Sequence, residues 1–364
     1  MTEASLPTPL AGPADQPLST ADIVALTVTY GRRIALIRLC VQSLEALGIP
    51  RLVIVGNGVD AAYKLELEAL KTTANLAITI VHLDKNVGAG AGFTAAIRHA
   101  RAELGDRYLW LLDDDNCPRP GALEALRHAA KQCDPLHSLI AFTSLRGERF
   151  PLWLNAAKTG QGEGVFYRKS SISSLDVRRI PEFVLKRLRS SPPSLPLMTE
   201  VDSSPEAQGV DIPGGPYGGF FIHSRHIDVI GYPDERFVLY FDDLEWTNRV
   251  RRHGGHVVLV PGCVVDDAEG DWAAGDAQPT GRSRFFMIDL LRSENPKRLY
   301  YSIRNNIYFK SRYWSDGWVI TAANVTMFVT LALGLGLVLR RPRNAWTMVS
   351  AAFDGVTGRL GGSL

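Results

Sequence analysis

Tyr108-Leu109-Trp110-Leu111-Leu112-Asp113-Asp114-Asp115 joins an apolar run of strand length to three consecutive carboxylates. A short apolar run without polar alternation is typical of a strand that is buried on both faces of a parallel sheet. Unpaired carboxylates are costly to bury, so Asp113–Asp115 are expected beyond the strand's end. There they form either a solvated turn or the oxygen ligands of a divalent cation. The preceding strand favours the cation, because it brings the carboxylates to the mouth of the sheet.

Around this stretch the chain alternates between strand and helix patterns. Strands are expected at 23–30, 51–55, 77–83 and 107–112, and helices at 33–47, 60–72, 93–103 and 121–131. This alternation predicts an α/β fold with a mostly parallel sheet and helices on both faces. Ligands of such sheets bind beyond the carboxyl ends of the strands. The candidate ligand-binding segments are therefore 30–32, 56–58, 84–92 and 113–116.

The composition bounds the class of protein. The 364 residues carry 40 Lys and Arg against 38 Asp and Glu, a balance that argues against a broad nucleic-acid-binding surface. The four cysteines are scattered without a CxxC pair, as expected for reduced thiols in a cytosolic protein. Residues 1–21 are rich in Pro, Ala, Ser and Thr and lack the features of a secretory signal, so they are expected to form a flexible tail.

The rest of the chain is expected to form one domain over 22–270, with loops at 150–215, and a helical C-terminal region over 271–364. Trp318–Leu339 contains no charged residue in 22 positions, which is long enough to cross a membrane. Basic residues flank both of its ends, whereas a true span should show positive bias on one side. An interfacial helix, a single span and a buried core helix all remain open.

A second acidic cluster, Asp242-Asp243-Leu244-Glu245, follows the aromatic run 237–241 and opens a helical pattern. One interpretation is an N-cap and first helical turn, where the helix dipole favours acidic residues. The other is chemical, because a carboxylate crowded by like charges has a raised pKa and suits general-base catalysis. Asp243 or Asp242 is the candidate base.

Three further segments combine glycine or arginine with polar residues. Residues 86–92 and 214–219 are glycine-rich, so each is either a plain turn or a place where backbone approaches a ligand. Arg304, in the basic-aromatic segment 300–306, is either a phosphate clamp or a structural arginine.

Together these motifs resemble the inverting glycosyltransferases of family 2, which have the GT-A fold, and most closely their galactofuranosyltransferase and rhamnosyltransferase branch. The resemblance runs from about Ile23 to Gly361. Its pieces are 27–30, 86–88 with 91–92, 113–115, 231–237, 241–246, 300–301 with 304–305, and 354–355 with 358–359. Where members often supply a histidine as a metal ligand, this chain has Asp266-Asp267.

The resemblance implies a role for each group of residues. Within 22–270, it assigns 22–135 to the nucleotide sugar and 210–270 to the acceptor and catalysis. It implies Mn²⁺ or Mg²⁺ held by Asp113, Asp115 and Asp267, and catalysis by Asp243 with Asp242. The implied nucleotide-sugar contacts are Thr27, Tyr30, Arg32, Asn57, Asn86, Gly88, Gly92, Asp113, Asp114 and Arg304. The implied acceptor contacts are Tyr217, Gly218, Gly219 and Trp246.

The resemblance implies a metal-dependent transfer of galactofuranose from UDP-galactofuranose to a glycan or polyprenyl-linked saccharide, in cell-surface polysaccharide synthesis. The expected location is the cytoplasmic side of the inner membrane, with no nucleic-acid partner. Alternatives are a rhamnosyltransferase that uses dTDP-rhamnose, a non-catalytic glycan- or nucleotide-binding protein on the same scaffold, and, more distantly, a nucleotidyltransferase.

Overall fold

The computed structural model describes residues 18–146, 151–165, 168–173, 175–180, 201–269 and 286–361. Most of the expected N-terminal tail lies outside these residues. The chain forms two compact units. The first comprises residues 1–166, 200–238 and 242–270, and the second comprises 167–199, 239–241 and 271–364. Each unit is described separately below.

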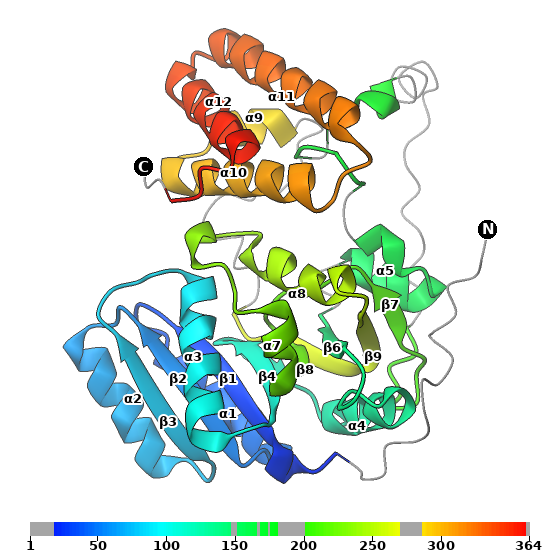
Figure 1. The fold of residues 1–364 in the computed structure, drawn as a ribbon. Helices are drawn as coiled ribbons and strands as arrows, with labels where there is room; N and C mark the ends of the chain where they lie inside the picture. The colour runs from blue at the N-terminus through cyan, green and yellow to red at the C-terminus, as the bar shows by residue number, and fades with distance from the viewer. Residues whose placement is uncertain are drawn as a thin grey trace. The chain divides into compact units, whose positions relative to one another are not determined.

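The first unit contains the α/β sheet (Figure 1). Its strands are β1 (Ile23–Thr29), β2 (Arg51–Asn57), β3 (Ala77–Leu83), β4 (Tyr108–Asp113), β5 (Asn116–Pro118), β6 (Ile140–Leu145), β7 (Val210–Ile212), β8 (Phe220–His223) and β9 (His256–Asp267). Its helices are α1 (Ile34–Ala46), α2 (Ala61–Thr73), α3 (Ala89–Leu104), α4 (Ala122–Cys133), α5 (Pro151–Thr159), α7 (Ile227–Ile230) and α8 (Asp242–Arg252).

Within the described residues the sheet order is β3-β2-β1-β4-β8-β6-β9-β5, with β7 beside β9. The first four strands run parallel, whereas β8 is antiparallel to both β4 and β6. This is the mixed, mostly parallel sheet that the sequence predicted, so the α/β fold class is confirmed. The parallel order places the carboxyl ends of β1, β2 and β4 side by side at one edge.

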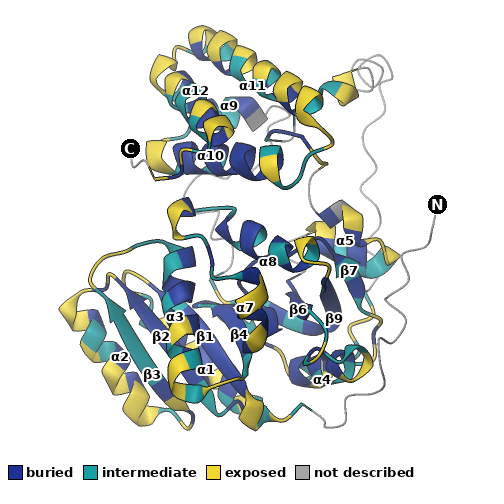
Figure 2. Cartoon of the chain, viewed as in Figure 1, coloured by how far each residue is buried: buried dark blue, intermediate teal, exposed yellow. Residues whose placement is uncertain are grey.

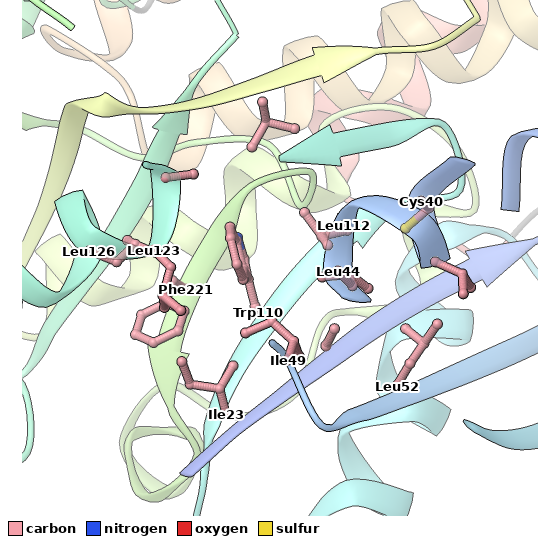
Figure 3. Close-up of a cluster of buried hydrophobic side chains, with 14 of the residues drawn as sticks. Ile23, Cys40, Leu44, Ile49, Leu52, Trp110, Leu112, Leu123, Leu126 and Phe221 are labelled. Carbon is pink, nitrogen blue, oxygen red and sulfur yellow. The ribbon is translucent and has the colours of Figure 1, made fainter. Parts of the chain in front are cut away.

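Helices cover both faces of the sheet. Ile23, Trp110 and Leu112 point to one face, where they pack with buried side chains of α1, α2 and α4 (Figure 3). Successive strand residues point to opposite faces, so Val28 belongs to the other side. There α3 packs so closely that a Cβ on Gly92 would lie 2.6 Å from a methyl group of Val28.

The second unit is helical, with α9 (Phe286–Leu291), α10 (Pro296–Arg312), α11 (Trp318–Val338) and α12 (Pro342–Thr357). The Asn295 side chain caps α10, and Pro296 occupies its first turn. Among the described residues, α11 is the one helix long and apolar enough to cross a membrane, with a mean hydropathy of 1.8. Only 28% of that apolar window is buried, so α11 is not the buried core helix that the sequence left open.

The structure differs from the sequence prediction in two places. Helix α3 begins at Ala89, not near Phe93, because Gly88 takes a φ of +92° and ends the turn earlier. Gly92 therefore lies inside a helix and not in a loop. The region 150–215 contains helix α5, which was not expected, and the short strand β7; residues 150, 166–167, 174 and 181–200 lie outside the described part.

Candidate active site

The aspartate triplet lies at the carboxyl edge of the sheet. Asp113 ends β4 and pairs in parallel register with Val28 near the end of β1. The side chain of Asp113 is 36% exposed, whereas those of Asp114 and Asp115 are only 5% and 4% exposed. The sheet thus presents one accessible carboxylate and two buried ones.

Asp114 is held by groups from β1 and from the loop before α1. Its Oδ2 accepts hydrogen bonds of 2.8 Å from both the Thr29 hydroxyl and the Arg33 Nε. Arg33 also reaches Glu269, at 2.5 Å, and lies 3.9 Å from Asp115. Burial raises the pKa of Asp114, and these donors oppose the rise. Asp114 is therefore a buried carboxylate that Thr29 and Arg33 hold in a fixed position.

Arg146, the residue directly after β6, bridges two carboxylates. Its guanidinium is almost completely buried, donates to Asp113 Oδ2 at 3.0 Å and makes a short contact to Asp267. Asp267 also accepts a 2.7 Å hydrogen bond from Asn116, its partner across the β5–β9 pair. Asp267 is thus held by two donors, and its role as third metal ligand stays a prediction.

Asp115 has longer contacts, because the Asn116 amide donates to its Oδ1 at 3.3 Å and Arg33 lies 3.9 Å from its Oδ2. Removal from water raises its pKa to about 7, and the charges of Asp113, Asp267 and Asp114 add to the rise. Within the described residues no three His, Cys, Asp or Glu side chains are gathered as a metal-binding group. A cation held jointly by protein and diphosphate needs only one or two carboxylates. Asp113 and Asp115 fit that role, since Asp113 is accessible and the charges of Arg33 and Arg146 leave the pKa of Asp115 raised.

Gly218 closes this corner of the site. A Cβ at this position would lie less than 3.0 Å from Arg146, Asn116 and Asp113 at once. Gly219 has a φ of +88°, and its amide donates to the Leu111 carbonyl at 2.8 Å. Glycine is therefore required at 218 for space and at 219 for conformation. The structure brings this expected acceptor segment directly against the aspartates.

Asp242 and Asp243 open α8, with Asp242 buried and Asp243 half-buried. Removal from water raises the pKa of both carboxyls, and repulsion from Asp242 raises that of Asp243 further. Backbone amides, including that of Gly90, oppose the rise at Asp242. The charge of Asp113 also acts on both groups, so the two acidic clusters share one electrostatic environment.

The backbone before this pair is strained. Val238, Tyr240 and Phe241 all have positive φ values of 63° to 65°, a region that side chains with a Cβ rarely adopt. Such strain persists where surrounding structure imposes it, and it is common at functional sites. Asn305 supplies part of that constraint by donating to the carbonyls of Leu239 and Tyr240 at 2.7 and 3.0 Å.

The turn after β3 is organised by Asn57. Its side chain donates to Asn86 Oδ1 and to the Gly88 carbonyl, and it accepts from the Val87 amide at 3.0 Å. Gly88 lies against the Val238 carbonyl, where a Cβ would overlap it. Asn57, Asn86 and Gly88 are thus brought together, with Asn57 shaping the turn from its buried position.

The remaining residues that were expected to contact the nucleotide sugar, on β1, just after it and on α3, differ in how far they are exposed. Thr27 is completely buried in β1, Tyr30 is 38% exposed beneath the Arg33 guanidinium, and the exposed Arg32 pairs with Asp60 at 3.1 Å. Gly92 is buried against Val28. Of this group, Tyr30 and Arg32 are accessible, whereas Thr27 and Gly92 support the packing of the sheet.

Tyr217 lies near Asp242 of the second acidic cluster, and Trp246 packs against the ring of Tyr217. The ring of Tyr217 contacts those of Phe93 and Trp246, at centroid distances of 4.6 and 5.8 Å. Trp246 is fully buried, and its indole nitrogen donates to the Gly231 carbonyl at 2.8 Å. Trp246 therefore supports Tyr217 from the core, and an acceptor would reach it only if neighbouring side chains moved.

Arg304 belongs to the second unit, where it is fully buried. It donates to Asn305 Oδ1 and to the Leu360 carbonyl at 2.8 and 2.9 Å, and it lies over the ring of Tyr301. These contacts are those of the structural arginine that the sequence left as an alternative, and its nucleotide contact stays a prediction.

Arg146 and Arg33 were missed from the sequence. Arg146 directly follows β6, and Asp113 is the last residue of β4, so the rule that ligand sites lie at strand ends would have found Arg146 if β6 had been recognised. Arg33 carries no such signal, since its partner Asp114 is 81 positions away in the chain.

The first unit thus combines a mostly parallel α/β sheet with two acidic clusters in one electrostatic environment. Residues 25–173, less than half of the chain, match the family model described as "Glycosyl transferase family 2". The match identifies a glycosyltransferase family 2 domain within residues 25–173. No curated protein matches its sequence.

Among solved structures, the chain is similar to GalNAc-T7 crystallised with UDP, GalNAc and Mn²⁺, at 14% identity and a TM-score of 0.45. This similarity covers 93% of the present chain and 58% of the GalNAc-T7 chain, so the chain spans little more than half of that protein's crystallised length. It is also similar to residues 1–349 of S. aureus TarS, alone and with UDP. Those identities are 11% and 10%, each with a TM-score of 0.42, over 93% of this chain and 92% of that one.

Proposed function

We propose that the protein transfers a sugar with inversion from a nucleoside diphosphate to a glycan hydroxyl, with Asp113 and Asp115 at the diphosphate and Asp243 at the acceptor. The observation that carries this proposal is the contrast between the two acidic clusters. Asp113 is accessible and paired with a buried arginine, whereas Asp243 has a raised pKa and no arginine partner among the described residues.

Asp113 and Asp115 would hold Mn²⁺ or Mg²⁺, which when bound supplies positive charge to the departing diphosphate. Arg146 fixes the orientation of Asp113 through the 3.0 Å hydrogen bond, and Gly218 leaves room for that pair. Arg33 and Thr29 hold Asp114 in place behind them. These residues thus present one accessible carboxylate to the donor in a fixed position.

Asp243 would accept the proton of the acceptor hydroxyl as its oxygen bonds to the anomeric carbon and the bond from that carbon to the diphosphate breaks. A base works best when its pKa lies near the working pH, and the environment raises that of Asp243 toward it. Asp242 Oδ2 and the Tyr217 hydroxyl are buried and have no hydrogen-bond partner among the described residues, and both lie near Gly90. Such atoms support a ligand-binding role for this side of the site.

The donor is proposed to be UDP-galactofuranose, the acceptor a glycan or polyprenyl-linked saccharide, and the setting cell-surface polysaccharide synthesis at the cytoplasmic side of a membrane. The resemblance of 241–246 to the galactofuranosyl branch supports the donor, and the exposed apolar helix α11 supports the membrane.

Turnover with a panel of purified nucleotide sugars tests this proposal. Release of UDP from UDP-galactofuranose, dependent on an acceptor, is expected. Transfer from dTDP-rhamnose alone would replace the donor and keep the chemistry. Nucleotide binding without turnover of any sugar would favour the non-catalytic alternative, and release of pyrophosphate from a nucleoside triphosphate would favour a nucleotidyltransferase.

A further inference from the structure

We propose that α11 and α12 together form a surface that docks on an anionic phospholipid bilayer, with α11 lying in the interface and not crossing the membrane. This proposal concerns the second unit alone and is independent of the sugar donor.

The first observation is an apolar ridge on the two helices. Large apolar side chains are exposed along α11 and, unexpectedly, along α12 as well, on the sides that show as exposed in Figure 2. The most exposed are Trp318 at 81%, Leu337 at 76%, Val338 at 78% and Trp346 at 68%. The complete ridge comprises Trp318, Val319, Leu331, Leu333, Leu337, Val338, Trp346, Phe353 and Val356. Exposed apolar surface of this extent marks an interaction site.

The second observation is that one side of α11 is fixed to polar backbone. Asn324 is completely buried in the helix's second turn. Its amide nitrogen donates to the Ser170 carbonyl at 2.9 Å, and its Oδ1 accepts from the Val177 amide at 2.7 Å. The Thr321 hydroxyl adds a 3.0 Å hydrogen bond to Ser170. Residues 168–173 and 175–180 are therefore fixed to the buried side of α11, and they would have to move with the helix.

That attached segment is strongly charged, which argues against a span. Arg178 pairs with Asp176 at 2.8 Å and with Asp316 at 2.6 Å, close to the start of α11. A helix crossing the bilayer would draw these charges and their irregular backbone into hydrocarbon, where lipid-exposed loops do not occur. An in-plane helix keeps them on the water side while its exposed side enters the lipid.

The buried stripe also explains why the sequence left α11 ambiguous. Thr321, Asn324, Phe328, Ala332 and Gly336 recur at helical spacing and are the buried residues of α11. An isolated interfacial helix needs a polar face, which α11 lacks. Here the protein covers that side, so the whole unit is amphipathic although the helix is not.

The third observation is positive charge at one end of the ridge. Arg340, Arg341 and Arg343 lie exposed where α11 turns into α12, beside Leu337 and Val338. Among the residues that the structure describes, no carboxylate pairs with these three arginines. Arginine next to exposed aliphatic residues and tryptophan matches the phosphate and glycerol layers of an anionic membrane. This charge complementarity favours a bilayer over a second copy of the chain or an apolar protein partner.

Vesicle flotation of the full chain tests the proposal. We expect flotation with vesicles of phosphatidylcholine mixed with phosphatidylglycerol, and release of the bound chain by alkaline carbonate. The double variant Trp346→Ser/Phe353→Ser should lower partitioning about tenfold or more. The variant Arg341→Gln/Arg343→Gln should lower it about tenfold with phosphatidylglycerol and leave the weak binding to phosphatidylcholine alone unchanged.

The matched control is Leu39→Ser/Leu65→Ser, which removes two exposed leucines from the first unit and should leave partitioning unchanged. Far-ultraviolet circular dichroism verifies that each variant is folded, and the milder Trp346→Gln replaces any that is not. Retention after carbonate would show a span and overturn the proposal. Absence of flotation, or a stable dimer that the Trp346→Ser/Phe353→Ser variant dissociates, would overturn it equally.

Discussion

The two acidic clusters of the first unit share a residue type and differ in their surroundings. Asp113 and Asp114 accept hydrogen bonds of 3.0 and 2.8 Å from Arg146 and Arg33. Among the described residues no arginine or lysine pairs with Asp242 or Asp243, and backbone amides are the donors there. Arginine opposes the rise in pKa that burial causes at Asp114, whereas no cation opposes the rise at Asp243 within the described residues. This difference supports the proposed division, in which the first cluster serves the diphosphate and its metal and the second moves a proton.

The largest effect is expected from Asp243→Asn, which keeps the size of the base and removes its function. We expect kcat to fall by about 10²- to 10⁴-fold, as for loss of a general base, with the affinity for UDP nearly unchanged. Steady-state turnover and calorimetric titration of UDP measure the two quantities. Asp228→Asn, at an exposed carboxylate that pairs with Arg101, is the control. Unchanged turnover would remove Asp243 from the mechanism.

Arg146→Met should destabilise the protein at the first acidic cluster, Asp113–Asp115, by removing the ion pairs of Arg146 with Asp113 and Asp267. It leaves Asp113 and Asp267 buried or half-buried without their shared guanidinium, so the free energy of unfolding should fall by about 3–5 kcal/mol. Urea unfolding measures this loss. In the double variant Arg146→Met/Asp267→Asn part of it should return, since one of the stranded charges is gone. Strictly additive losses would mean that the two side chains do not interact.

Gly218→Ala tests how closely the side chains around Asp113 and Arg146 are packed. Because the added methyl group would meet Arg146, Asn116 and Asp113, we expect a loss of about 1–3 kcal/mol in unfolding free energy and a higher KM for the donor. Gly334→Ala, in a helix with open space around the position, should instead stabilise by about 0.5–1 kcal/mol. A neutral Gly218→Ala variant would show that the corner is looser than described.

The smallest effect is a shift in pH dependence. Only the deprotonated base accepts a proton, so kcat/KM should fall as the pH drops through the raised pKa of Asp243. Asp242→Asn removes the neighbouring charge that raises this pKa, and the acid limb should therefore move to lower pH. A pH–rate profile of both proteins measures the shift. Movement to higher pH would contradict the proposed coupling.

Much of the first unit was predictable from local sequence. The apolar runs of β1 to β4 and the aspartates after Leu112 mark strand ends without reference to the rest of the chain. The second acidic cluster was found for a different reason, because it opens a helical pattern after the aromatic run 237–241. The start of α3 was missed because glycine spacing alone does not show that Gly92 is needed against Val28.

The arginine partners were not predictable, because each contact joins segments far apart in sequence. Arg146 and Asp267 are 121 positions apart, and their approach depends on the pairing of β6 with β9. The side of α11 that faces the protein was equally hidden, since its contacts come from segment 168–180. The sequence thus predicted the positions of the two acidic clusters. It did not show which of their carboxylates are paired with an arginine.

A crystal structure of the full chain with UDP and Mn²⁺ tests the division of labour most directly, because anomalous scattering locates the manganese independently of the protein atoms. We predict one manganese site, at Asp113 and Asp115 and bridging the diphosphate, with Asp267 still bound to Arg146 and no metal at Asp242 or Asp243. Manganese at Asp242 and Asp243, or away from both clusters, would contradict the account.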